Sequence, residues 1–186
     1  GGVKLTGEVR PIPNKNSVLA ALPACILTNE DVVYENIPKT LDVEKLLEMM
    51  RLMGVKIKRS NGKVVVNCSS MNSYKVDMAL GSKIRASLMF VGPLLARFGK
   101  TEIPLPGGCL LGFRSIASHV RSFKKVGVKV EVKKDRVVFE APKKQKKNLS
   151  VWQLEASPTS TENLAMYLAG IEAESVVTDA ASEPHV

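Results

Sequence analysis

The sequence predicts a mixed α/β fold built from repeated βαβαββ units, and the main observation is an internal repeat. Residues 46–67 and 119–140 share one pattern at an offset of 73 residues, with Gly54 at the place of Gly127. In both copies apolar residues at helical spacing lead to a glycine, then to an alternating strand, a polar turn and a second strand. We therefore expect each copy to fold as a helix with a glycine C-cap followed by a β-hairpin.

A further helix and strand precede each copy, which gives the rest of the unit. We expect units at about 3–70, 71–142 and 149–186. The predicted elements upstream of the two hairpins, and those of the third unit, are helices at 17–27, 84–98 and 161–171 and strands at 32–36, 101–105 and 175–178.

The third unit stops after its strand, about halfway through the pattern. The missing helix and hairpin would leave an apolar face uncovered, so we expect the sequence to be a fragment of a longer protein. A genuine terminal cap is the alternative.

The composition is that of a globular domain, with 45% hydrophobic and 24% charged residues. The longest apolar run, residues 86–96, is broken by Gly92 and Pro93 and is shorter than the roughly 20 residues that a membrane-spanning helix needs. The N-terminus has no pattern of a secretion signal. We therefore expect a cytoplasmic protein with no membrane partner.

The formal charge of +9 raises the possibility of nucleic-acid binding. Four of the lysines form a compact run in residues 143–147 beside Pro142, which is typical of a solvated surface loop. Aromatic residues are only 5% of the chain, so there is little material for base stacking. A small anionic substrate would also use basic residues, and we expect no nucleic-acid partner.

The cysteines and histidines do not suggest disulfides or a metal site. Cys25, Cys68 and Cys109 are widely spaced without a C-x-x-C pair, and His119 and His185 are the only histidines. We expect free thiols and no metal ligands. The sequence also lacks the glycine-rich dinucleotide, P-loop and nucleophile-elbow motifs.

The segment 104–114, Pro-Leu-Pro-Gly-Gly-Cys-Leu-Leu-Gly-Phe-Arg, carries the most chemical information. Its prolines and glycines predict a loop between a strand and a helix, able to approach or cover a ligand. Cys109 would be exposed there, and Arg114 would lower the pKa of its thiol or bind a phosphate or carboxylate. An ordinary loop cysteine is the alternative.

The predicted starts of three helices carry further candidate anion-binding groups. Lys15 and Asn16 open the first helix, Arg85 opens the corresponding helix of the second unit, and Ser157 and Thr159 lie where the third begins. If a pseudo-threefold axis relates the units, these starts converge on one anionic ligand, near free backbone N–H groups. Capping by Ser, Thr and Asn is the alternative for each start.

These segments together resemble the UDP-N-acetylglucosamine enolpyruvyl transferases. The resemblance spans nearly the whole chain in order and rests on Lys15-Asn16, the pattern in 19–37, Ile84-Arg85-Ala86-Ser87, Gly-Pro-Leu-Leu-Ala-Arg-Phe-Gly at 92–99, Leu-Pro-Gly-Gly-Cys at 105–109, and Thr161-Glu162-Asn163-Leu164. It implies an inside-out α/β barrel domain of three units. It also implies that the second domain of these enzymes is absent here.

The resemblance implies an enzyme of peptidoglycan synthesis that moves enolpyruvyl from phosphoenolpyruvate to the 3-hydroxyl of UDP-N-acetylglucosamine, without a metal or organic cofactor. Cys109 would form an adduct with phosphoenolpyruvate, assist product release and react with fosfomycin. Lys15 and Arg114 would bind phosphate and carboxylate, and Arg85 would support this cluster. The remaining substrate-binding candidates are Asn16, Ser157 and Thr159.

The sequence departs from the family on the nucleotide side. Residues 115–118 are Ser-Ile-Ala-Ser where the family usually has Pro-Val-Asp-Leu, Glu155 stands near a basic position of some members, and Thr159 replaces a usual glycine. The phosphoenolpyruvate side is therefore better retained than the nucleotide side. A 5-enolpyruvylshikimate-3-phosphate synthase-like enzyme, which lacks the loop cysteine, and a non-catalytic binding domain are the alternatives.

Overall fold

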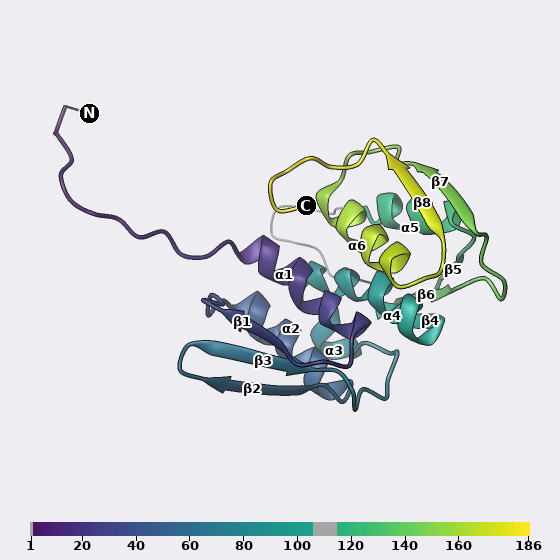
Figure 1. Cartoon of the computed structure of the whole chain (residues 1–186), viewed down its shortest axis with the longest axis horizontal. Coiled ribbons are helices and arrows are strands. Elements are labelled where there is room, and N and C mark those ends of the chain that lie inside the picture. Colours follow the sequence, from purple (N-terminus) through teal and green to yellow (C-terminus); the bar gives the residue numbers. More distant parts are fainter. Residues whose placement is uncertain (1, 106–114) are drawn as a thin grey trace.

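The computed structural model describes residues 2–105 and 115–186. Helices and small sheets alternate along the chain (Figure 1). In order, the elements are α1 (Lys15–Ala24), η1 (Cys25–Leu27), β1 (Val32–Glu35), α2 (Leu41–Leu52), β2 (Lys56–Ser60), β3 (Lys63–Asn67), α3 (Met78–Gly81), η2 (Arg85–Phe90), α4 (Val91–Phe98), β4 (Lys100–Pro104), α5 (Ala117–Lys125), β5 (Lys129–Val132), β6 (Arg136–Glu140), β7 (Asn148–Trp152), α6 (Pro158–Ala169) and β8 (Glu174–Thr178).

The two predicted helix-hairpin copies form closely similar structures. The first gives an antiparallel sheet of order β1-β3-β2 and the second one of order β4-β6-β5. Gly54 (φ 91°) and Gly127 (φ 86°) follow α2 and α5 with positive φ, a conformation that only glycine adopts without strain. The glycine that the repeat predicts at the end of each helix is therefore required by the backbone.

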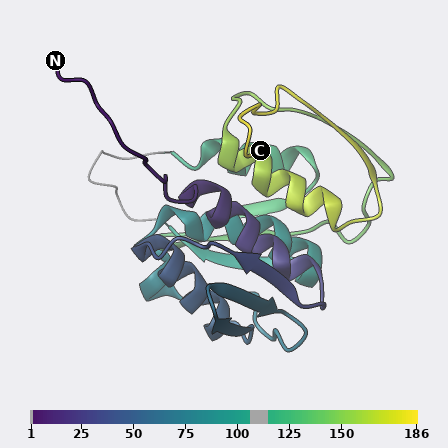
Figure 2. The same ribbon diagram turned by 60° about the vertical axis from the view of Figure 1, so that its left-hand side comes forward.

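The strands of the third unit pair differently from those of the first two units, because the strand that opens the βαβαββ pattern is present in it as β7. β7 and β8 lie parallel, from Asn148 opposite Glu174 to Trp152 opposite Thr178, with α6 as the crossover between them. In the second unit the corresponding strand is reduced to one parallel bridge, between Lys75 and Glu102. In the first unit residues 2–14 contain no strand, are exposed, and extend away from the body of the molecule (Figures 1 and 2).

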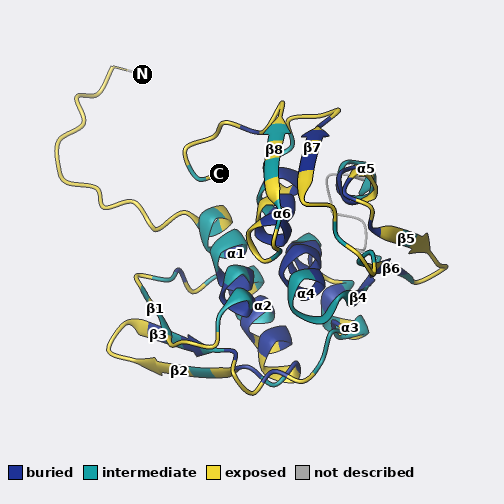
Figure 3. Cartoon of the chain, turned by 45° about the vertical axis from the view of Figure 1, so that its right-hand side comes forward, coloured by how far each residue is buried: buried dark blue, intermediate teal, exposed yellow. Residues whose placement is uncertain are grey.

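The core lies between the central helices and the sheets (Figure 3). α6 packs against both α1 and α4, and the inner faces of these three helices join one continuous cluster of buried apolar side chains. The aromatic rings of Phe123, Phe139 and Tyr167 meet edge to face in this cluster, at centroid distances of 5.6 and 5.9 Å. These rings join α5, β6 and α6 within the core.

The expected helix over residues 84–98 is divided in the structure. Residues 85–90 form the 3₁₀-helix η2, and the α-helix α4 begins at Val91. Pro93 has no N–H to donate, and it lies in the first turn of α4, where that N–H would have no partner within the helix. Arg85 therefore lies at the start of the 3₁₀ segment.

Candidate functional site

The starts of α1, the η2–α4 run and α6 lie on the same side of the molecule (Figure 1). Lys15 is the first residue of α1, Arg85 the first of η2, and Thr159 the second of α6. The helices that carry them pack on one another. The unpaired N–H groups of helix starts favour anions, so this side is suited to a negatively charged ligand.

Capping of α1 accounts for only part of the polar sequence at its start, which includes Lys15 and Asn16. Asn14 is the N-cap, and its side chain accepts hydrogen bonds from the backbone N–H groups of Asn16 and Ser17. The Lys15 Nζ lies 2.7 Å from the Asp42 Oδ2 at the start of α2, with both side chains partly exposed. An incoming anion would therefore compete with one surface carboxylate for Lys15.

Arg85 is anchored next to α5. Its Nη2 donates to the Ser115 carbonyl oxygen at 2.8 Å, and the Ser115 Oγ accepts from the Ala117 N–H in the first turn of α5. Cys109 and Arg114, the candidates on the 104–114 loop, lie outside the described residues, and so do 106–108 and 110–113.

Ser157 and Thr159 stand at the start of α6, as the hydroxyl-rich sequence suggests. Ser157 occupies the N-cap position, yet its side chain makes no capping hydrogen bond, and Pro158 takes the first helical position. Thr159 is exposed, and its Oγ1 lies 3.3 Å from the Nε2 of the buried His119. The capping interpretation therefore does not account for Ser157.

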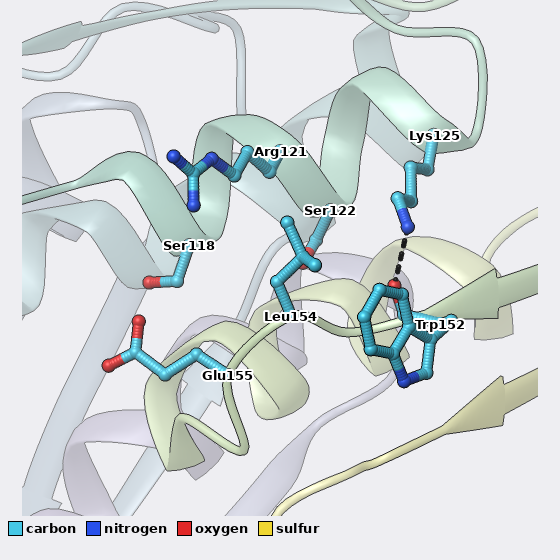
Figure 4. Close-up of a pocket in the computed structure, with 7 residues that line it drawn as sticks. All are labelled: Ser118, Arg121, Ser122, Lys125, Trp152, Leu154 and Glu155. Atoms are coloured by element: carbon cyan, nitrogen blue, oxygen red, sulfur yellow. Dashed lines mark hydrogen bonds between the residues drawn. The ribbon is translucent and has the colours of Figure 1, made fainter.

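Ser118 and Glu155, two positions at which the sequence departs from the family that it resembles, line one pocket between α5 and the segment that follows β7. Figure 4 shows its residues, with Ser118 and Glu155 facing each other across it. The Lys125 Nζ donates to the Trp152 carbonyl oxygen at 2.9 Å and lies 4.9 Å from the centre of the Trp152 ring. The full lining is Ser118, Arg121, Ser122, Lys125, Trp152, Leu154 and Glu155.

The two described cysteines are buried and have weakly acidic thiols. Burial raises the pKa of Cys25, although the Tyr34 hydroxyl lies 3.2 Å from its Sγ, and burial raises the pKa of Cys68 to about 12. Thiolates are scarce at such pKa values, so neither thiol is suited to nucleophilic chemistry.

Sequence reasoning missed the roles of His119, Asn163 and Arg97. His119 and Asn163 form a buried polar cluster behind Thr159, described below. Arg97 donates to the carbonyl oxygens of Ile26 and Cys68 and to the Asn29 side chain, so it ties the second unit to the first. The segment 92–99 that contains Arg97 contributed only to the family resemblance. For all three residues, the signal in the sequence was a polar side chain within a predicted apolar helix face.

Within residues 2–105 and 115–186, no helix is both long and apolar enough to cross a lipid bilayer. Over the same ranges, no three His, Cys, Asp or Glu side chains are grouped as they would be around a metal ion.

Solved structures share this fold. The enolpyruvyl transferase NikO from Streptomyces tendae superposes with a TM-score of 0.71 at 18% identity, covering 90% of this chain and 39% of its own. An EPSP synthase from Acinetobacter baumannii gives a TM-score of 0.67 at 14% identity, covering 92% of this chain and 40% of its own. The mixed α/β fold expected from the repeat is therefore confirmed.

Sequence relatives match over the whole chain. A UDP-N-acetylglucosamine 1-carboxyvinyltransferase of Borrelia garinii subsp. bavariensis is 37% identical over 186 residues, and one of Campylobacter fetus subsp. fetus is also 37% identical over 186 residues. All of this chain is covered in both cases, but only 43% and 44% of the relatives. The chain thus spans less than half the length of the relatives it matches.

The family match has the same extent. Residues 1–186 match the family described as EPSP synthase (3-phosphoshikimate 1-carboxyvinyltransferase). With the fold and the relatives, this match shows that the chain belongs to the EPSP synthase family of enolpyruvyl transferases.

Proposed function

We propose that this chain is the first half of an enzyme that transfers the enolpyruvyl group of phosphoenolpyruvate to the 3-hydroxyl of UDP-N-acetylglucosamine, releasing phosphate. The observation that carries the proposal is the match of all 186 residues of this chain to part of the UDP-N-acetylglucosamine 1-carboxyvinyltransferases, at up to 37% identity. The location of the helix starts of α1, η2 and α6 on one side of the molecule supports it, because both substrates are anions.

The donor side is formed by basic residues at these starts and on the 104–114 loop. Lys15 and Arg114 bind the phosphate and carboxylate of phosphoenolpyruvate, and Arg85 supports the positive charge around them. The reaction passes through a tetrahedral adduct that carries both anionic groups, so fixed cations stabilise it without rearranging during the reaction. Cys109 is the thiol that forms an adduct with the donor.

The acceptor side is formed by Asn16 and by Ser157 and Thr159 at the start of α6. The uncommitted Ser157 hydroxyl and the free N–H groups of the first turn of α6 suit a phosphate-bearing sugar nucleotide. Glu155 opposes this role electrostatically, because it puts a carboxylate in the neighbouring pocket. A direct comparison of two acceptors tests this part of the proposal.

The other half of the site comes from a second domain, on the same polypeptide or on a partner chain. The relatives are more than twice as long as this chain, which supports this part of the proposal. We place the enzyme in the cytoplasm, where phosphoenolpyruvate and nucleotide sugars are made. Peptidoglycan synthesis is the pathway that consumes the product.

The test is phosphate release by the complete polypeptide from phosphoenolpyruvate, with either UDP-N-acetylglucosamine or 3-phosphoshikimate as acceptor. We expect turnover with the sugar nucleotide alone. Turnover with 3-phosphoshikimate alone would replace this function with the EPSP synthase reaction, and turnover with neither would favour a binding domain.

Variants of the complete polypeptide test the donor side. Lys15→Ala and Arg114→Ala should each lower the affinity for phosphoenolpyruvate by at least tenfold, since each removes one partner of a charge pair that the ligand desolvates. Lys63→Ala is the matched control, because Lys63 of β3 forms an exposed ion pair with Glu35 of the neighbouring strand β1. Normal donor binding by both site variants would remove these two assignments.

A further inference from the structure

A buried polar cluster lies directly behind the start of α6. His119 of α5 is 1% exposed and Asn163 of α6 is 0% exposed, and the two side chains meet with His119 Nδ1 3.2 Å from Asn163 Nδ2. On its other edge the imidazole presents Nε2 to the exposed Thr159 hydroxyl at 3.3 Å. A buried group therefore contacts a side chain that we assign to the acceptor side.

Backbone groups of the second unit fix the orientation of the Asn163 amide. The Gly92 N–H donates to Asn163 Oδ1 at 2.6 Å, and Asn163 Nδ2 donates to the Leu88 carbonyl oxygen at 2.7 Å. Turning the amide over would place two donors together at Gly92 and two acceptors together at Leu88. The amide therefore has one orientation, with its second N–H directed at His119.

This orientation determines which nitrogen of His119 carries the proton. Nδ1 faces an N–H donor and must accept, so in the neutral ring the proton is on Nε2. The ring is neutral because burial lowers the pKa of His119 to about 4, with a further contribution from the charge of Arg85. The Nε2–H then donates to Thr159 Oγ1.

A hydroxyl whose oxygen already accepts one hydrogen bond has its own proton free to donate elsewhere. For Thr159 that proton is directed away from His119, at the exposed start of α6. Three hydrogen bonds in series thus run from the Gly92 N–H of α4 through Asn163 and His119 to the Thr159 hydroxyl. They set the direction of its O–H bond.

We propose that His119 is a positioning residue that holds the Thr159 hydroxyl as an outward-pointing donor for an oxygen of the acceptor substrate. This rests on the proposed function, in which the start of α6 contacts the UDP-sugar. Asn163 is a second positioning residue, since its hydrogen bond sets the tautomer of His119.

The tautomer is measurable without any activity. In protein labelled with ¹⁵N-histidine, long-range ¹H–¹⁵N spectra should show His119 as the Nε2–H form, unchanged from about pH 8 to about pH 5. His185, in the C-terminal segment, provides the second resonance set for comparison. Thr159→Val should shift the Nε2 proton of His119. An Nδ1–H form, or protonation near pH 6.5, would overturn the proposal.

Steady-state kinetics of the complete polypeptide test the consequence. His119→Asn keeps an acceptor at the Nδ1 position and removes the donor to Thr159, whereas His119→Gln keeps a donor at the Nε2 position. We expect His119→Asn and Thr159→Val each to raise KM for UDP-N-acetylglucosamine by about tenfold with kcat changed less than about threefold, the scale of one hydrogen bond. His119→Gln should recover most of the loss.

The double variant His119→Asn with Thr159→Val should behave like Thr159→Val alone, because both changes remove the same donor. Additive losses, or a loss confined to kcat, would overturn the positioning role. Thr159 is exposed, so its variant keeps the test informative if His119→Asn fails to fold. If the unsubstituted complete polypeptide does not use UDP-N-acetylglucosamine, the proposed function is wrong. The NMR spectra then test the tautomer of His119 by themselves.

Discussion

At the residue scale, the cysteine, histidine and lysine side chains discussed above differ in burial and in hydrogen bonding. Cys25 and Cys68 lie in the apolar core, where a thiol behaves as a small hydrophobic group. His119 is equally buried but fully hydrogen-bonded, and burial holds it neutral. Lys15, by contrast, is partly exposed and has a displaceable partner in Asp42.

We expect thiol reagents to discriminate among the three cysteines. At about pH 8 brief alkylation should label Cys109 first, because the raised pKa values of Cys25 and Cys68 leave almost no thiolate and both groups are buried. Peptide mass spectrometry gives the order, and labelling in denaturant, where all three should react alike, is the control. Early labelling of Cys25 would contradict the expectation.

Acid should destabilise the chain through His119. Its pKa falls from 6.5 in the unfolded chain to about 4 in the fold, so the unfolded state takes up a proton first as the pH is lowered. This contribution to stability is fully present above pH 6.5 and is lost between pH 6.5 and about pH 4, in total about 3 kcal/mol.

Urea unfolding at a series of pH values measures this loss. The parent should lose stability over that interval more steeply than His119→Asn, which has no titrating ring, and the difference between them isolates His119 from the carboxylates. Parallel pH dependences would show that His119 is not held neutral in the fold.

At the element scale, close contact between α4 and α6 depends on glycine. A Cβ added to Gly92 would lie 2.0 Å from the Asn163 carbonyl oxygen, far inside van der Waals contact. Gly92 has no positive φ, so its requirement is steric rather than conformational. The glycine in the 92–99 motif thus allows the approach on which the Asn163 hydrogen bonds depend.

Gly92→Ala is expected to lower the free energy of unfolding by about 3 kcal/mol or more, because backbone must separate from backbone and the buried hydrogen bonds of Asn163 lengthen. Gly62→Ala is the matched control: that site is open, and only its positive φ of 75° opposes the change, at about 1 kcal/mol. Equal losses in urea unfolding would show that α4 and α6 can move apart at little cost.

The sequence predicted those elements that local patterns specify. The hairpins, with Gly54 and Gly127 before them, follow from alternation and from the demand for positive φ. Within the part of the chain that the structure describes, residues 2–14 pair with no strand, and no local sequence pattern specifies such a partner. The contact between His119 and Asn163 joins residues 44 apart, and such pairs depend on packing that no single segment specifies.

At the scale of the whole molecule, the units are joined by polar contacts as well as by the common core. Arg97 at the end of α4 binds carbonyl oxygens at residues 26 and 68 in the first unit, and Asn163 in the third unit binds the backbone at residues 88 and 92. The second unit therefore connects the other two, and the three helix starts keep fixed relative positions.

We expect the 186-residue chain to fold cooperatively and yet to be inactive. Its core is continuous, but the proposed second domain supplies the remaining cationic groups and the acid–base residue, which contributes typically 10²- to 10⁴-fold. Phosphate release by this chain should be compared with that of the complete polypeptide, and circular dichroism should verify folding. Full turnover by the shorter chain would refute the proposed division of the site.

The contact between Gly92 and Asn163 also sets an order of events during synthesis. The two residues are 71 positions apart, so at roughly 5–20 residues per second the ribosome takes several seconds to add Asn163 after Gly92. During this delay the Gly92 N–H and the Leu88 carbonyl lack their eventual partner, and water must satisfy them. The nascent second unit thus stays hydrated where the mature one is dry, and its burial is completed only after α6 has emerged.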